Sequence, residues 1–106
     1  MIIEGKYTEE DWYGEVKVDG EILDPKPSQA VYNHSPDGFA WGYDGSGPAQ
    51  LALAILLHAG IKEKVALRYY QAFKRQFISR LPRDSFRIEV PVVTWMNRER
   101  RGVGNG

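Results

Sequence analysis

Apolar and polar residues alternate along the first part of the chain in the manner of half-buried strands. Within residues 12–18 the alternation is found in the last residues. Apolar residues resume in residues 21–23, after the dipeptide Asp19-Gly20. Asp-Gly supplies the positive φ angles of a tight turn, so the pattern predicts a β-hairpin. The apolar positions within residues 2–7 predict a further strand beside it.

The segment after the hairpin combines turn residues with short apolar stretches. Two prolines within residues 24–28 end the sheet run, because proline has no amide hydrogen for a ladder. Residues 29–32 and 39–43 are predicted as short strands, joined by the Ser-Pro-Asp-Gly turn of residues 35–38. One face of the second strand carries three aromatic residues at a period of two: Phe39, Trp41 and Tyr43.

A buried helix is predicted near the centre of the chain. Its start combines a cap, either Ser46 or Gly47, with Pro48 in the first turn. Residues 51–59 are apolar around most of the helix circumference, which requires a place in the core. Gly60 ends the helix, since glycine suits the left-handed residue that follows a helix.

A second, amphipathic helix is predicted over residues 62–80, and Pro82 stops it. Its apolar residues recur at spacings of three and four: Ala66, Tyr70, Phe73, Phe77 and Leu81. Its other face is polar and mostly basic: Lys64, Arg68, Gln71, Lys74 and Arg75. We expect the apolar stripe to pack against the core and the basic face to be exposed.

The last part of the chain is predicted to return to the sheet. Residues 86–90 alternate as a strand, and Pro91 makes it an edge strand or bends it before residues 92–96, which are predicted as a closing strand around Trp95. Residues 97–106 are expected to form a flexible C-terminal tail, which leaves residues 1–96 as one compact domain. We predict an α+β fold: a mostly antiparallel sheet with two helices, arranged as a helix-turn-helix hairpin, packed on one face.

The composition is that of a single globular domain. A chain of 106 residues with 42% hydrophobic residues leaves no room for separate cofactor and substrate lobes. Cysteine is absent and the two histidines are far apart in sequence, so neither a metal nor a cofactor is expected. The longest apolar run, residues 51–57, is too short to cross a bilayer, and the N-terminus lacks a signal-peptide pattern. We therefore expect a cytoplasmic protein without membrane contact.

The formal net charge is zero, but charge is divided unevenly along the chain. Residues 1–50 hold three lysines against ten carboxylates, a net charge of −7. Residues 51–106 hold eleven basic against four acidic residues, a net charge of +7. Either the acidic half screens the basic half within one domain, or a basic face is left exposed to meet a partner.

The glycine-rich loop of residues 42–47 leads into the predicted helix start and is a candidate anion site. Free amides and the positive end of a helix dipole hold phosphate or carboxylate groups. The candidate residues are Gly45, Ser46, Gly47, His34 and Tyr43. The spacing matches neither a P-loop nor a dinucleotide fingerprint, and Asp44 would repel an anion. The demands of a strand-to-helix turn also account for these glycines.

Catalysis is a less favoured hypothesis. Residue types for acid–base or nucleophilic chemistry are present: His34, Ser35, Asp37, Asp44, Ser46 and His58. A nucleophile elbow is not formed, because Pro48 stands where the Gly-x-Ser-x-Gly pattern needs its second glycine. We assign no catalytic residue and treat weak hydrolysis as an addition to the anion-binding alternative.

The basic face of the second helix is the favoured binding surface. Its candidate residues are Lys64, Arg68, Lys74 and Arg75. Such a face suits nucleic acid phosphates or an acidic protein surface. Aromatic residues crowd the same helix, which argues against a dedicated DNA-recognition helix, and Trp95-Met96 offers an apolar contact for a protein. We predict a non-enzymatic interaction module whose partner is a protein or a nucleic acid.

Residues 33–56, with the sequence NHSPDGFAWGYDGSGPAQLALAIL, resemble the signature of a family of small prokaryotic and phage proteins of unknown function. The likeness is looser in the helix from Tyr70 to Phe77 and around Trp95. Ala40 stands where the family pattern implies an acidic residue. The resemblance implies a compact domain that recurs in mobile or viral contexts, such as an accessory protein that docks on a host macromolecule. It implies no catalytic residue.

Overall fold

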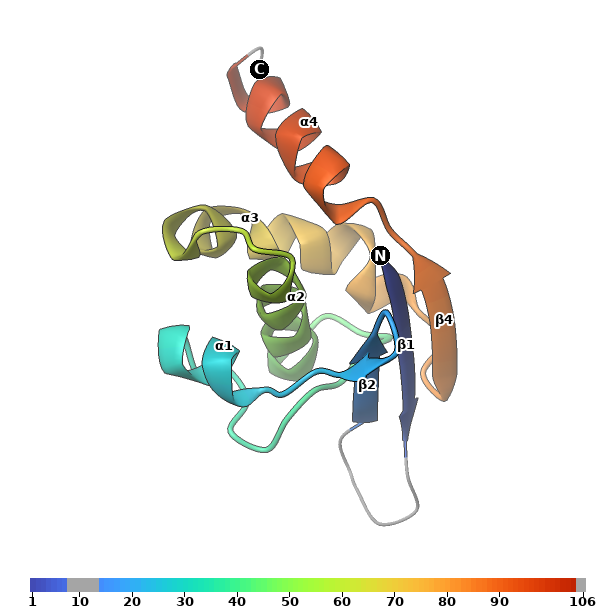
Figure 1. Ribbon diagram of the computed structural model, residues 1–106. Coiled ribbons are helices and arrows are strands. Elements are labelled where there is room, and N and C mark those ends of the chain that lie inside the picture. The colour runs from blue at the N-terminus through green and yellow to red at the C-terminus, as the bar shows by residue number, and fades with distance from the viewer. Residues whose placement is uncertain (8–13, 105–106) are drawn as a thin grey trace.

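The computed structural model describes residues 1–7 and 14–104 and shows an α+β domain with helices on one side of a sheet (Figure 1). The elements are β1 (Ile2–Tyr7), β2 (Gly14–Val18), β3 (Glu21–Ile22), α1 (Lys26–Val31), α2 (Ser46–His58), α3 (Glu63–Gln76), the 3-10 helix η1 (Ile78–Arg80), β4 (Ser85–Glu89) and α4 (Val92–Gly104). The predicted α+β class is confirmed. The described chain has four α-helices, however, where the sequence predicted two.

The sheet is antiparallel, with the strand order β3-β2-β1-β4. The predicted hairpin is confirmed: β2 and β3 flank Asp19 and Gly20, whose φ angles of 49° and 85° fit the tight turn. β1 is a central strand, in which Ile3 lies opposite Val18 on one side and Ile88 on the other. β4 is an edge strand, which is the first of the two arrangements predicted from Pro91.

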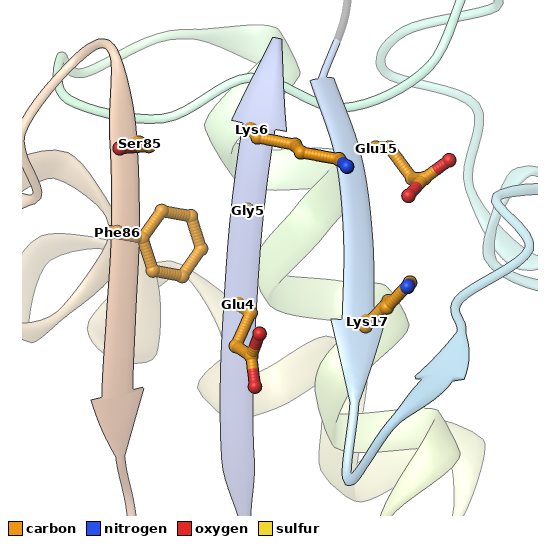
Figure 2. Close-up of a pocket in the computed structure, with 7 residues that line it drawn as sticks. All are labelled: Glu4, Gly5, Lys6, Glu15, Lys17, Ser85 and Phe86. Atoms are coloured by element: carbon orange, nitrogen blue, oxygen red, sulfur yellow. The ribbon is translucent and has the colours of Figure 1, made fainter. Parts of the chain in front are cut away.

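The two faces of the sheet differ in chemistry. The face toward the helices carries Ile3, Val16 and Val18, all buried. The other face is charged, with Glu4 opposite Lys17 and Lys6 opposite Glu15. Figure 2 shows Lys6 reaching from β1 over β2 toward Glu15, beside a hollow of about 240 Å³. Opposite charges on paired residues favour this register and leave the hollow without a dominant charge.

Helix α2 is the centre of the core, as predicted. Residues 47–56 are all buried, and α3 packs against this helix with Ala66 and Phe73. The helix begins at Ser46 with Gly45 at the N-cap, one residue before the first of the two predicted caps. Gly60 has a φ angle of 86°, so the predicted left-handed end is confirmed.

A tight aromatic contact joins the sheet to the middle of the chain. Trp41 is 0% exposed, its ring stacks on Tyr7 at a centroid distance of 4.4 Å, and Phe86 meets it edge-on at 5.0 Å. Gly14 lies against the same ring, where a Cβ atom would come within 1.9 Å of Trp41 Cη2. The absence of a side chain at Gly14 lets the indole approach the backbone of β2 closely.

The two short strands predicted in the middle of the chain are wrong. Most of residues 29–32 lie in helix α1, which Asp24 supports by accepting a hydrogen bond from the Lys26 amide at 2.9 Å. Residues 39–43 form only an isolated bridge between Phe39 and Gly14. The Pro36-Asp37 turn is present. The segment follows the surface of the core through aromatic packing instead of ladder pairing.

The end of the chain is also helical, so the strand predicted for residues 92–96 is wrong. Pro91 permits a helix start, because it has no amide hydrogen to satisfy and its carbonyl accepts from the Trp95 amide at 2.8 Å. Residues 97–104, expected as a tail, continue α4, which projects from the body (Figure 1). The flexibility of this segment stays a prediction.

One side-chain contact orients α4 on α3. The Trp95 ring meets Phe73 edge-on at 5.2 Å, and Trp95 Nε1 donates a 2.8 Å hydrogen bond to Gln76 Oε1. Gln76 Nε2 in turn donates to Glu99 Oε1 at 2.5 Å. The amide of Gln76 therefore bridges two successive turns of α4.

Candidate functional site

A buried glutamine organises the surface segment between α1 and α2. Gln50 is 0% exposed, and its Oε1 accepts hydrogen bonds from the amides of His34 and Ser35 at 2.7 and 2.9 Å. Its Nε2 donates to Ser28 Oγ at 2.8 Å and to the Tyr32 carbonyl at 3.1 Å. We call this set the Gln50 network. Because one side-chain amide uses all four of its bonding positions, the loop is held in one arrangement on α2.

His34 stands at the edge of this network and contacts two tyrosines. Its ring stacks on Tyr32 at 4.2 Å with an interplanar angle of 13°, and we call this pair the Tyr32 platform. On the other side, His34 Nε2 and the Tyr70 hydroxyl share a 2.6 Å hydrogen bond. Burial, followed by the positive charge of Lys74, lowers the pKa of His34 below its usual 6.5. The imidazole is therefore neutral at pH 7.

This pKa shift predicts a loss of stability in mild acid. The unfolded chain binds a proton at His34 near pH 6.5, before the folded chain does, so the free energy of unfolding falls as the pH drops through 6.5. The loss levels off once the pH is below the folded pKa. Urea unfolding of the wild type and of His34→Gln between pH 8 and 5 measures it. A difference between the two proteins that does not change with pH would contradict the shift.

Lys74 does not lie on an exposed face, contrary to expectation. It is 8% exposed, and its Nζ lies 2.5 Å from Asp44 Oδ1. The hydrogen bond from Lys74, and then its charge, lower the pKa of Asp44, which keeps this carboxylate ionised at neutral pH. Lys74 therefore ties α3 to the glycine-rich loop and has little charge to offer a partner.

The other three predicted cations do face solvent. Lys64, Arg68 and Arg75 are exposed, and at about 100° per residue they fall within about 40° of one another around the axis of α3. Ala66 and Phe73, both buried, lie on the opposite side of the helix. Within the described residues no carboxylate forms an ion pair with these three cations. We call Lys64, Arg68 and Arg75 the basic stripe.

Tyr43, a residue of the glycine-rich loop, packs against the glycines of the same loop. Tyr43 lies against Gly45, where a Cβ atom would come within 2.6 Å of Tyr43 Cε2, and the Arg83 guanidinium lies 5.0 Å from the ring centroid. Gly47 is buried against Ala40. These contacts account for two glycines by close packing. They bring Tyr43 to the helix start, whereas the hydrogen bonds of His34 go to Tyr70 and Gln50.

The catalytic residue types are not assembled into a reacting group. Ser35 is buried and its amide is bound to Gln50, and in the described part of the chain no hydrogen bond links a histidine to a serine hydroxyl. His58 lies at the end of α2, away from the His34 contacts. Among residues 1–7 and 14–104, no three metal-ligating side chains form a cluster. None of the helices described is long and apolar enough to cross a membrane.

Sequence reasoning missed the residues that build the site. Gln50 is not among the predicted site residues, although a lone amide within an apolar run is a signal of a buried polar contact. Tyr70 was assigned to the core stripe, and it is buried as expected while its hydroxyl reaches His34. Nothing in the sequence pairs Tyr32 with His34 across a helix end.

These features define a small α+β domain with an ordered polar loop and a cationic helix. The sequence profile of a family described as "Family of unknown function (DUF6166)" matches residues 5–98, and the chain belongs to this family. The resemblance to a family of unknown function is thereby confirmed. No curated protein and no solved structure matches the chain.

Proposed function

We propose that the protein is a non-enzymatic interaction module that binds an acidic macromolecule through the basic stripe. The observation that carries the proposal is the position of Lys64, Arg68 and Arg75 on the side of α3 directly opposite its buried residues. Exposed cations that form no ion pair within the described residues contribute little to folding, so their charge is available to a partner.

The distribution of charge supports the same interpretation. Within residues 1–7 and 14–50, Asp44 pairs with the buried Lys74, and Glu4 pairs with Arg87 on the far face of the sheet. Neither carboxylate forms an ion pair with the stripe, although Asp44 also feels the charge of Arg75. Further exposed arginines lie on α4, at Arg98 and Arg100, so the surface that meets an acidic partner can extend onto this helix.

Reversing one charge of the stripe should weaken binding to a polyanion. We expect Arg68→Glu to bind fluorescently labelled heparin about tenfold less tightly at low salt, since one ionic contact is lost and a repulsion is added. Lys26→Glu is the matched control, because Lys26 is exposed on α1, outside the stripe. Fluorescence anisotropy at 50 mM NaCl compares the two variants with the wild type.

The result that would refute the proposal is equal affinity in Arg68→Glu, Lys26→Glu and the wild type, or no binding of heparin by any of them. Circular dichroism checks that each variant is folded, which the exposure of both side chains leads us to expect. The packing of α2 and α3 as a helix-turn-helix hairpin, and a role as a cytoplasmic accessory of a phage or mobile element, stay predictions.

A further inference from the structure

We propose that two copies of this chain associate through the free edge of β4, which continues the sheet from one molecule into the other. The partner is a second copy because the charges on this strand complement one another when the strand is paired with itself. β4 shares no residue with the basic stripe, so the inference does not depend on the proposed function.

The free edge of β4 carries unused backbone groups. β4 is the last strand in the sheet order, and Figure 1 shows no described helix or strand beyond it. The Val90 amide donates to the Met1 carbonyl at 2.9 Å, and backbone groups alternate in direction along an antiparallel strand, so Phe86 and Ile88 also bond to β1. The N–H and C=O groups of the intervening residues point away from the sheet, and within residues 1–7 and 14–104 no hydrogen bond reaches them. We call these intervening residues the β4 edge: Ser85, Arg87 and Glu89.

Charges alternate across the outer face of the sheet up to this edge. Lys17 on β2 lies opposite Glu4 on β1, and Glu4 lies opposite Arg87. Arg87 Nε is 3.5 Å from Glu4 Oε1, yet the Arg87 side chain is still 69% exposed. Glu89 lies opposite the apolar Ile2 and forms no ion pair within the described residues. The row of charges therefore ends on a cation that can accept a further carboxylate, and the same strand carries a carboxylate that lacks a cation.

Charge selects one way of pairing β4 with itself. An antiparallel pair must bring the β4 edge of one copy opposite the β4 edge of the other, and three registers do so with an overlap of at least three residues. They place Arg87 opposite Ser85, Arg87 or Glu89 of the second copy. The first register gains no ion pair, and the second puts like charges together, which is unfavourable. The third joins Arg87 of each copy to Glu89 of the other, so we assign this register.

The assigned register also suits the backbone and the apolar side chains. Each Arg87–Glu89 pair is of the type that exchanges both of its N–H···O bonds. Ile88 of one copy then lies opposite Ile88 of the other, as a pair without hydrogen bonds, in which side chains approach most closely. Ile88 is only half-buried in the single chain, so this contact buries apolar surface that is otherwise partly exposed.

The opposite edge of the sheet is a poorer place for a second copy. β3 has two residues, and because the Leu23 amide donates to the Val16 carbonyl, only Ile22 directs its backbone groups outward. Charged residues on an edge strand usually discourage pairing with another chain. On β4 they oppose one register and favour another. A contact through one short strand belongs to the smallest class of interface, so we expect association to be weak and visible only at high concentration.

The wild-type protein tests the proposal by mass and by hydrogen exchange. In sedimentation equilibrium between about 10 µM and 1 mM, we expect the average mass to rise from 12.1 kDa toward twice that value. Over the same range the Arg87 and Glu89 amides should gain protection from exchange, measured by NMR. The Phe86 and Ile88 amides, which already bond to β1, should not change. A constant mass of 12.1 kDa, or association without added protection at Arg87 and Glu89, overturns the proposal.

Charge reversal tests the register. Arg87→Glu and Glu89→Arg each place like charges opposite one another twice in the pair, so each variant alone should associate about tenfold more weakly. In an equal mixture of the two variants every facing pair again has opposite charges, so association should return. Lys26→Glu is the control, since Lys26 is exposed on α1 and the variant has the same net charge as Arg87→Glu.

The mixture guards against an effect of folding, because a variant that is unfolded cannot regain association when a second variant is added. The control should associate like the wild type. Association that persists unchanged in both single variants, or a mixture no better than either variant, would show that the β4 edges do not meet in this register and would overturn the proposal.

Discussion

Replacement of Gln50 with leucine is expected to lower the free energy of unfolding by about 3 kcal/mol, because two amides, one buried and one partly buried, lose their acceptor at once. Those amides belong to His34 and Ser35, and the Tyr32 carbonyl loses its donor in the same substitution. The new side chain fills similar space but satisfies none of these groups. Urea unfolding followed by tryptophan fluorescence measures the change.

The chain offers a matched control in Gln29. Its Nε2 donates a single hydrogen bond of 2.8 Å to the Ser35 carbonyl, and the residue is only half-buried. Gln29→Leu should therefore cost about 1 kcal/mol, the usual worth of one hydrogen bond. If Gln50→Leu costs no more than this control, the Gln50 network does not hold the loop.

Addition of a single methyl group at Gly14 is expected to be as damaging. In Gly14→Ala the new Cβ atom would lie 1.9 Å from Trp41 Cη2, and the indole cannot retreat because Tyr7 and Phe86 hold it. Overpacking of this kind costs about 3 kcal/mol, at the upper end of the usual range. Thermal and urea unfolding report the loss.

Two further variants show whether the clash is the cause. Gly102→Ala places a methyl group in open space on α4 and should leave stability unchanged or slightly raised, since alanine favours helix. In a Trp41→Phe background the far atoms of the indole are gone, so Gly14→Ala should cost less there than in the wild type. Additive losses in the double variant would show that Gly14 acts through something other than Trp41.

The elements that sequence predicts best are those with a strong local signal. The Asp19-Gly20 turn admits few conformations, so the β2–β3 hairpin follows from two residues. Helix α2 combines a long apolar run with Gly60 at its end, and α3 repeats apolar residues at helical spacing. In each case the local preference and the final packing agree, which is the condition for a reliable prediction.

The errors occur where the residue pattern of a short segment is compatible with both a strand and a helix. Residues 92–96 read as a strand because Val92 and Val93 favour sheets, yet Val92, Trp95 and Met96 also share one side of a helix. Packing of Trp95 on Phe73 decides between the two, and that contact joins residues distant in sequence. Tertiary contacts of this kind override local propensity.

The candidate site divides in the same way. Helical periodicity alone placed Lys64, Arg68 and Arg75 on the solvent side of α3, and they are exposed. The periodicity did not reveal that Lys74 is buried, because its partner Asp44 lies in a loop whose path depends on aromatic packing. The Gln50 network needs the loop and the helix to be placed together before it can be recognised.

The sheet order has a consequence for how the protein folds during its synthesis on the ribosome. The inner strand β1 emerges early, but one of its neighbours, β4, is synthesised only after the helices α1, α2 and α3. Until then the nascent chain exposes an open edge along Ile3, with the hairpin alone to cover it. The sheet can therefore be completed only after nearly the whole domain has been translated. Until then, the N-terminal strand is the segment that a chaperone would need to shield.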